Sequence, residues 1–238
     1  MPLTEEEQAI YDRAVAFARA NKRDIAKRLT DKTIYLPEEE PVSVFMAGSP
    51  GAGKTEASLE LLDELAGEVQ VLRIDPDELR HEFDNYGGGN SYLFQGGVSI
   101  LVEKIHDLAL KNRQSFLLDG TLANYDKARD NVRRSLRKNR LVQILYVYQE
   151  PLLAWDFVQA REATEGRRIL VEDFIDQYFS ARDTVNRLKA LFGKELQIDL
   201  LLKDIDNSHR AYKANIDRID NHVREKYTPA SLADALKQ

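Results

Sequence analysis

The stretch FMAGSPGAGKTEAS, which runs from Phe45 to Ser58, decides the fold of this 238-residue chain. It satisfies the pattern G-x-x-x-x-G-K-[ST], with an apolar run before it and a helix-forming segment after it. Glycines let successive backbone N–H groups turn toward a phosphate chain, while Lys54 supplies positive charge and the Thr55 hydroxyl suits a magnesium ion. We therefore predict a loop that binds the phosphate chain of a nucleotide, formed by Gly48, Ser49, Pro50, Gly51, Ala52, Gly53, Lys54 and Thr55.

Apolar, β-branched runs around this loop alternate with segments of helical periodicity, which is typical of a parallel sheet with crossover helices. The expected strands are residues 42–48, 69–75, 114–120, 141–148 and 195–202. The expected helices follow Lys54 and Pro76 and cover residues 97–113, 125–138 and 151–164. Strands this apolar are covered on both faces. The sequence therefore predicts an α/β fold with a mostly parallel five-stranded sheet and helices on both faces.

Two segments fall outside this alternation and divide the chain into three expected parts. Residues 1–40 form a polar, helix-prone N-terminal extension, and residues 41–205 form the α/β domain that contains the phosphate loop. Residues 206–238 form a helical C-terminal tail, in which Thr228 is placed to cap a short helix with Pro229 at its first position.

Composition excludes several classes of protein. The chain has no cysteine, which excludes disulfides and thiolate metal ligands, and its four histidines show no close pairing. Its net charge of −6 argues against a general nucleic-acid binder. No basic segment precedes an apolar run at the start, and no stretch approaches the ~20 apolar residues that span a bilayer. We expect a cytoplasmic protein without a membrane contact.

The phosphate-loop motif alone does not separate kinases from GTPases or ATP-driven machines. The chain contains no N-K-x-D sequence of the kind that reads guanine, and it is short for a motor. A small-molecule kinase with a P-loop kinase fold is the leading class.

Two carboxylates, Asp75 and Asp77, stand at the carboxyl edge of the second expected strand, where open α/β sheets bind ligands. Asp77 is a candidate general base that orients an acceptor hydroxyl and takes its proton. Asp75 fits the N-cap of the helix that begins near Pro76. Both acids equally fit a structural role at a helix start.

Other candidate residues follow the third and fourth strands. Asp119 ends an apolar strand and suits a magnesium ligand, although a turn aspartate would look the same. Thr121 suits a substrate oxygen or the start of a loop. Arg161 and Arg167, with Arg168 beside it, suit a lid that stabilises the charge of a transferring phosphate, or a solvated turn.

The glycine-rich segment from Asn85 to Gly97 lies near the candidate base and suits an acceptor site, or a flexible surface loop. Glu103 follows on the next expected helix and flanks its apolar stripe. We expect Glu103 to reach the site.

The order GSPGAGKT, RIDPD, a helix with Glu103, DGT and an arginine-rich segment resembles the zeta toxin family of bacterial toxin-antitoxin systems. The resemblance covers about Pro41 to Phe192. It implies a fold like that of nucleotide and chloramphenicol kinases. It also implies phosphorylation of the sugar 3′-hydroxyl of UDP-N-acetylglucosamine, with ATP and magnesium as cofactors. A further implication is an antitoxin protein that blocks the ATP site.

By position, the resemblance assigns a role to each candidate residue. It makes Lys54 and Thr55 the contacts to the ATP phosphates and magnesium, and Asp77 the catalytic base. It makes Glu103 and Thr121 substrate-binding residues. It makes Arg161 and Arg167 the lid arginines, because the family pattern of arginine, any residue and an aliphatic residue fits Arg167 better than Arg168. Leu170 departs from the pattern, since many members have proline there.

Three hypotheses remain open at this stage. The chain is a zeta-like kinase, a related kinase of another small-molecule, nucleotide or polynucleotide hydroxyl, or a non-catalytic ATP-binding module. A further hypothesis is that the N-terminal extension covers the site and restrains activity in cis.

Overall fold

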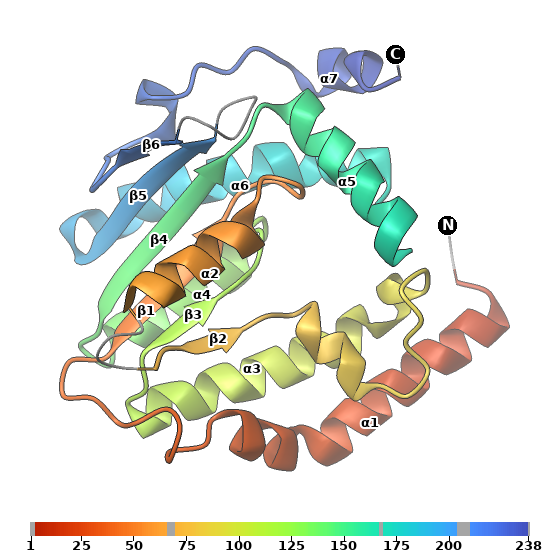
Figure 1. Cartoon of the computed structure of the whole chain (residues 1–238), viewed down its shortest axis with the longest axis vertical. Helices are drawn as coiled ribbons and strands as arrows, with labels where there is room; N and C mark the ends of the chain where they lie inside the picture. The colour runs from red at the N-terminus through yellow and green to blue at the C-terminus, as the bar shows by residue number, and fades with distance from the viewer. Residues whose placement is uncertain (1–2, 66–69, 167–168, 204–209, 238) are drawn as a thin grey trace.

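The computed structural model describes residues 3–65, 70–166, 169–203 and 210–237. Its described strands form one sheet in the order β2-β3-β1-β4-β5-β6 (Figure 1). The first five strands of the chain run parallel, and β6 runs antiparallel to β5. The bounds are β1 Val42–Ala47, β2 Leu72–Ile74, β3 Phe116–Leu118, β4 Leu141–Tyr148, β5 Leu196–Lys203 and β6 Arg210–Lys213. The predicted α/β class with a mostly parallel sheet is confirmed.

The sixth strand is a correction to the expected five. β6 pairs with β5, with Tyr212 opposite Leu201, and it lies in the segment expected to form a helical tail. Its four residues, Arg-Ala-Tyr-Lys, contain no apolar run, because a short strand at the edge of a sheet needs little burial. Apolar periodicity therefore does not reveal it.

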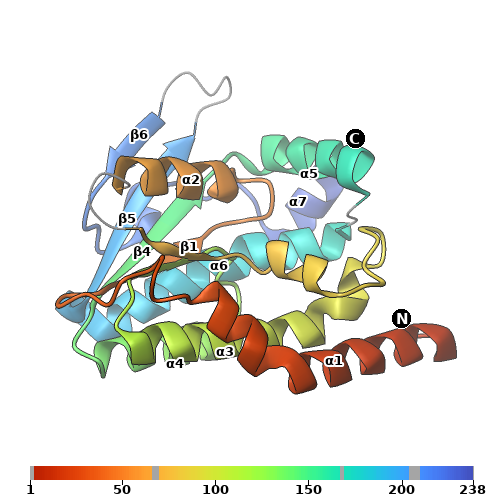
Figure 2. The same cartoon turned by 60° about the horizontal axis from the view of Figure 1, so that its bottom comes forward.

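Seven α-helices surround the sheet in the described part of the chain. They are α1 Glu5–Leu29, α2 Lys54–Leu65, α3 Gln95–Asn112, α4 Tyr125–Leu136, α5 Pro151–Glu165, α6 Val171–Phe192 and α7 Pro229–Ala235. Figure 2 shows α2 on one side of the sheet and α3, α4 and α6 on the other. The predicted coverage of both faces is confirmed.

Alternate residues of the central strand β1 belong to two apolar clusters, one on each face of the sheet. Phe45 and Ala47 belong to the larger core, which includes residues of α1, α3, α4 and α6. Val44 and Met46 point to the other face, where Ala57 of α2 joins them. This period of two on a strand buried on both faces explains why the strand reads as a continuous apolar run.

The N-terminal helix α1 is part of the larger core. It begins with a capping box at Thr4 and buries Ala14, Ala18 and Ala26. It packs along α3 at close range: a Cβ added to Gly97 would lie 2.9 Å from the Ala14 carbonyl oxygen. Small residues on both helices allow this approach. The expected helical extension is therefore packed onto the fold.

Only short helical segments occur between β2 and α3. A 3-10 helix, η1, covers Glu78–Glu82 in place of the α-helix expected after Pro76, and a second, η2, covers Ser91–Phe94. Two further 3-10 turns are η3 Gly193–Glu195 and η4 Ile219–Asn221. The short η1 segment brings the chain down from the strand edge toward α3.

The C-terminal tail crosses α6 and ends in α7. Arg182 on α6 donates to Asp220 at 2.6 Å and to Glu225 at 2.9 Å. The Thr228 side chain accepts from the Ser231 N–H and Pro229 occupies the first turn, which confirms the predicted cap. Among the described helices, none combines the length and apolar character needed to cross a membrane.

Candidate active site

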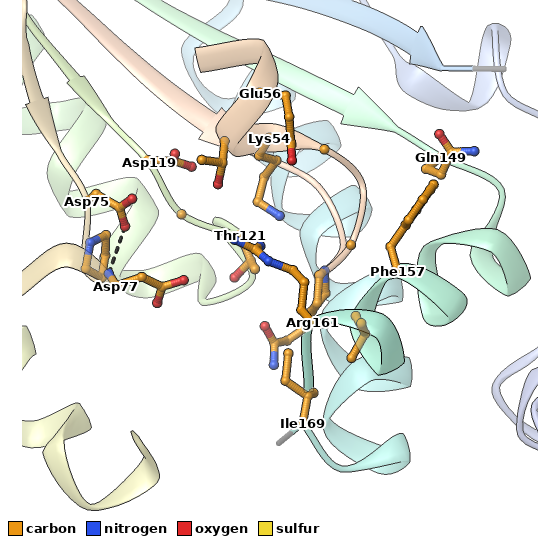
Figure 3. A pocket seen from close by; sticks show the side chains of 18 of the residues that line it. Lys54, Glu56, Asp75, Asp77, Asp119, Thr121, Gln149, Phe157, Arg161 and Ile169 are labelled. Carbon is orange, nitrogen blue, oxygen red and sulfur yellow. Dashed lines mark hydrogen bonds between the residues drawn. The ribbon is translucent and has the colours of Figure 1, made fainter. Parts of the chain in front are cut away.

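A cavity of about 640 Å³ opens at the carboxyl ends of the parallel strands. The phosphate loop, the segment after β2, the end of β3, helix α5 and the end of β5 all contribute to its lining. Figure 3 shows Lys54, Asp77, Thr121 and Arg161 directed into this one space. The lining includes the predicted site residues Pro50, Gly51, Gly53, Lys54, Thr55, Asp77, Asp119, Thr121 and Arg161.

The phosphate loop has the backbone that its glycines predict. Gly48 and Gly51 have φ angles of 136° and 72°, values that favour glycine. A Cβ at Gly48 would lie 2.3 Å from the Val147 carbonyl oxygen. Lys54 Nζ donates to the Ser49 carbonyl oxygen at 2.6 Å. The lysine is therefore folded back over its own loop, where it would meet phosphate oxygens.

Asp119, just after β3, is buried, with 5% of its surface exposed. Its Oδ2 accepts from Ser58 Oγ at 3.1 Å and from Arg73 Nη2 at 2.7 Å. Within the described part of the chain, no group donates to its Oδ1. Thr55 lines the same cavity. Magnesium is commonly held by one or two carboxylates together with substrate phosphates, and this donor set fits that chemistry.

No group of three or more acids or histidines that could hold a metal is found in the described residues. A magnesium ion in this cavity would therefore depend on the nucleotide for most of its oxygen ligands. Thr55 and Asp119 are the residues that would hold it.

Asp75 is not the N-cap that the sequence suggested. Its Oδ1 accepts from the Asp77 N–H at 2.8 Å, as the dashed line in Figure 3 marks, and its Oδ2 accepts from Arg73 at 2.6 Å. The cap position of η1 belongs to Asp77, whose side chain makes no capping bond. Burial raises the pKa of Asp75, while the Arg73 charge and the Asp77 N–H oppose that rise.

Asp77 lies on the opposite side of the cavity from the phosphate loop, and its side chain is 40% exposed. The guanidinium of Arg80, which is 5% exposed, donates to the Asp77 carboxylate through Nη1. Arg80 Nη2 also approaches Gln95 Oε1 at 3.4 Å. A partly exposed carboxylate in the wall of the cavity can receive a proton from a bound hydroxyl.

Arg161 projects from the last turns of α5 into the cavity. The helix ends at Gly166, which has a left-handed φ of 69°, and α6 begins at Val171. The predicted lid residue Arg167 and its neighbour Arg168 lie outside the described residues. Of the two expected lid arginines, Arg161 therefore lines the cavity, and Arg167 is outside the residues that the structure describes.

Glu103 does not line the cavity. Its side chain is exposed on α3, and its charge acts on Arg134 of α4, where it opposes the lowering of the Arg134 pKa by burial. The end of α3 that does reach the cavity is its start, through Gln95. Thr121 lines the cavity and its carbonyl oxygen accepts from the Gly48 N–H at 3.2 Å.

The sequence did not lead us to predict four residues that the structure places in or beside the cavity, namely Arg73, Arg80, Gln95 and Lys203. Arg73 and Asp75 lie two residues apart, and side chains two apart on a strand point to the same face, so the sequence alone could have predicted this pair. Lys203 ends β5 at the ligand-binding edge, and a Cβ at Gly53 would lie 2.2 Å from its Nζ. No local pattern marks Arg80 or Gln95, because their positions depend on the turns between β2 and α3.

The sheet, the phosphate loop and the convergent acids and arginines define a protein with a P-loop kinase fold. A family model for the zeta toxin matches residues 25–217, which is most of the chain, and the chain belongs to the zeta toxin family. Members of this family are P-loop kinase-like phosphotransferases. A comparison with curated protein sequences finds no match.

Solved structures show the same fold. One, described as the PezAT chromosomal toxin-antitoxin system of the human pathogen Streptococcus pneumoniae, has a TM-score of 0.60 at 20% identity and covers 99% of this chain and 87% of its own. The AvrRxo1-ORF1:AvrRxo1-ORF2 structure with sulphate ions has a TM-score of 0.59 at 12% identity, covering 92% and 72%. The AvrRxo1-ORF1:-ORF2 structure with ATP has a TM-score of 0.57 at 13% identity, covering 88% and 67%.

Proposed function

We propose that this protein is a kinase that transfers the γ-phosphate of ATP to a sugar hydroxyl, with the 3′-hydroxyl of UDP-N-acetylglucosamine as the leading acceptor. The proposal rests on the observation that Lys54, Asp77, Asp119 and Arg161 all line the same cavity. Membership of the zeta toxin family supports the acceptor and the harmful effect of the activity on its host.

In this proposal the phosphate loop holds the triphosphate by its backbone N–H groups, and Lys54 moves from Ser49 to the phosphate oxygens. Bound magnesium, held by Thr55 and Asp119, would neutralise phosphate charge. The hydroxyl oxygen forms a bond to the γ-phosphorus as the bond to the bridging oxygen breaks, and ADP leaves. Asp77 takes the hydroxyl proton.

Positive side chains stabilise the charge that spreads over the transferring phosphate. Arg161 is placed for this role within the cavity, and Arg167 is its proposed second member. Lys203 adds a third positive charge beside the phosphate loop. The reaction then depends on positioning and charge, with no covalent enzyme intermediate.

The acceptor side supports a second candidate. Because Glu103 lies outside the cavity, the residues available to an acceptor near Asp77 are Arg80, Gln95 and Thr121. That set differs from the one implied by the family resemblance. A kinase of another small-molecule, nucleotide or polynucleotide hydroxyl is therefore the alternative.

The direct test is incubation of the purified protein with ATP, magnesium and UDP-N-acetylglucosamine, followed by mass spectrometry. We expect an acceptor product heavier by one phosphate group. Absence of that product, with a phosphorylated product from a panel of nucleotides, sugars and oligonucleotides, would favour the alternative acceptor. No phosphorylated product from any acceptor, with ATP still bound, would favour a non-catalytic module.

An antitoxin partner is the second part of the proposal. The neighbouring structures include a toxin-antitoxin system, which supports a protein that blocks the ATP site. Expression of the wild-type chain should arrest growth of a bacterial host, and the Lys54→Ala variant should not. Equal toxicity of the two proteins would contradict a phosphate-transfer mechanism.

A further inference from the structure

Arg73 on β2 forms a network that the proposed reaction has not used. Its side chain is 11% exposed and lies between the ends of β2 and β3. Its guanidinium donates to Asp75 at 2.6 Å, to Asp119 at 2.7 Å and to Glu78 at 2.5 Å. Its Nε donates to Ser58 Oγ at 3.2 Å. One arginine therefore joins two carboxylates that follow neighbouring strand ends, Asp75 and Asp119, and a third, Glu78, on η1.

The network fixes the orientation of Asp119. Among the described residues, its two donors, Ser58 Oγ and Arg73 Nη2, bond to the same carboxylate oxygen, Oδ2. The other oxygen, Oδ1, has no donor among the residues that the structure describes. A carboxylate held in this way keeps one oxygen available for a ligand while its rotation is restricted.

The same arginine restrains the segment that carries the candidate base. Arg73 holds Asp75 Oδ2, and Asp75 Oδ1 accepts from the backbone N–H of Asp77. The chain of contacts runs from Ser58 and Asp119 through Arg73 to Asp75 and the backbone of Asp77. It therefore crosses from the side of the cavity that binds metal and phosphate to the side that binds the acceptor.

We infer that Arg73 is a positioning residue that orients Asp119 toward the magnesium-nucleotide complex and couples it to the Asp77 segment. The inference rests on the proposed function. A planar guanidinium suits this task because its donors reach several carboxylates in fixed directions, whereas a lysine ammonium acts as a single point charge. Two buried acids side by side also need a cation in the absence of metal.

The first test measures coupling without any activity. Urea unfolding is compared for the wild type, Arg73→Met, Asp119→Asn and the double variant. If the two side chains act together, the unfolding constant of the double variant lies within about threefold of that of Arg73→Met. If the fold-change in the unfolding constant of the double variant equals the product of the fold-changes of the two single variants, the coupling is overturned.

The second test measures magnesium-dependent binding by calorimetry with the non-hydrolysable analogue AMP-PNP, in magnesium chloride and in EDTA. Loss of an outer-shell partner costs about 10–100-fold in metal affinity. We expect Arg73→Met to reduce the gain in AMP-PNP affinity from magnesium by about tenfold or more. Arg73→Lys should show a smaller reduction. A gain equal to or larger than that of the wild type would overturn the inference.

Arg182→Met is the matched control. Arg182 is 8% exposed and also bridges two carboxylates, Asp220 and Glu225, but it lies on α6 beside the tail. This variant should lose stability and keep the wild-type magnesium gain. An equal loss of that gain in Arg182→Met would overturn the inference, since general destabilisation would then explain the result.

The two proposals fail in distinguishable ways. Binding of AMP-PNP with a magnesium gain that Arg73→Met leaves intact overturns only the role of Arg73. Absence of AMP-PNP binding by the wild type overturns the proposed function and the positioning role together. If Arg73→Met does not fold, Arg73→Lys decides the question, and a magnesium gain equal to that of the wild type overturns the inference.

Discussion

At the scale of single residues, Asp77 combines exposure to the cavity with an anchor. Arg80 donates to its carboxylate, and asparagine at this position would keep an oxygen that accepts the same bond. A general base contributes about 10²–10⁴-fold to a rate. We therefore expect Asp77→Asn to lower kcat by that factor and to leave AMP-PNP affinity unchanged, as measured by steady-state kinetics and calorimetry.

The control for this prediction is Glu82→Gln. Glu82 lies on the same 3-10 helix, but it pairs with Arg28 of α1 and does not line the cavity. Its kcat should stay near that of the wild type. If Asp77→Asn turns over as fast as Glu82→Gln, Asp77 is not the base.

A second residue-scale prediction concerns His106 on α3, which is buried between Phe45 and Phe116. Burial lowers its pKa from 6.5 to about 3. The folded state therefore favours neutral imidazole, and the unfolded state binds a proton below pH 6.5. The contribution of neutral His106 to the free energy of unfolding is fully present above pH 6.5. It decreases by up to about 1.4 kcal/mol per pH unit as the pH falls toward 3.

His106→Leu removes this titrating group from the core. Urea unfolding between pH 7.5 and pH 5 should show a weaker decrease in stability for His106→Leu than for the wild type. The exposed His222 offers a matched change, and His222→Gln should keep the wild-type slope. Equal slopes for all three proteins would show that the His106 pKa is not depressed in the folded state.

At the scale of elements, the sequence predicts the strands and loops whose signal lies within one continuous segment of the chain. The strands β1, β4 and β5 are apolar runs because both of their faces are buried, and the phosphate loop is one continuous motif. The edge strand β6 and the 3-10 helix η1 are too short for a periodic signal. The Arg73 contact to Asp119 joins residues 46 positions apart, and Glu103 is exposed on α3 and does not line the cavity. Such features depend on the packing of several elements, so no local pattern reports them.

The element-scale prediction concerns α7, which packs against α6 in an apolar cluster that also includes residues of α5, the helix that carries Arg161. Leu232 of α7 is fully buried in a cluster with Trp155 and Val158 of α5. Tyr227 also donates to Glu150, the N-cap residue of α5, at 3.3 Å. Truncation of a buried leucine to alanine costs about 2–5 kcal/mol.

We therefore expect Leu232→Ala to lower the free energy of unfolding in urea by about this amount, and to lower kcat if the position of Arg161 depends on the cluster. Leu191→Ala is the control, since Leu191 is 50% exposed on α6. A loss of stability no greater than that of Leu191→Ala would mean that the Leu232 cluster does not hold α7 against α5 and α6.

At the scale of the whole molecule, the packing of α1 distinguishes two roles for the N-terminal extension, a removable inhibitor and an integral part of the fold. No described residue of α1 lines the large cavity, whereas Ala14, Ala18 and Ala26 belong to the larger core. A smaller cavity of about 150 Å³ is lined by residues of α1, including Phe17, and by Phe83 and Phe94, and no residue of the phosphate loop lines it. Contacts of this kind favour a structural role.

Deletion of residues 1–38 should therefore destabilise the protein and should not raise its kinase activity, because it exposes the apolar face of α3 that α1 covers. A milder change tests the same interface. Gly97→Ala places a Cβ 2.8 Å from Phe83 Cζ and 2.9 Å from the Ala14 carbonyl oxygen. Overpacking of this kind costs about 1–3 kcal/mol, which urea unfolding measures.

Gly87 offers the matched glycine, because a Cβ there would meet no atom within 4 Å. Gly87→Ala should unfold at nearly the wild-type urea concentration, while Gly97→Ala should unfold at a lower one. The opposite result would arise if α1 were a mobile cover. The deletion would then leave stability unchanged and raise kcat, and Gly97→Ala would behave like Gly87→Ala, since no helix would be packed against Gly97.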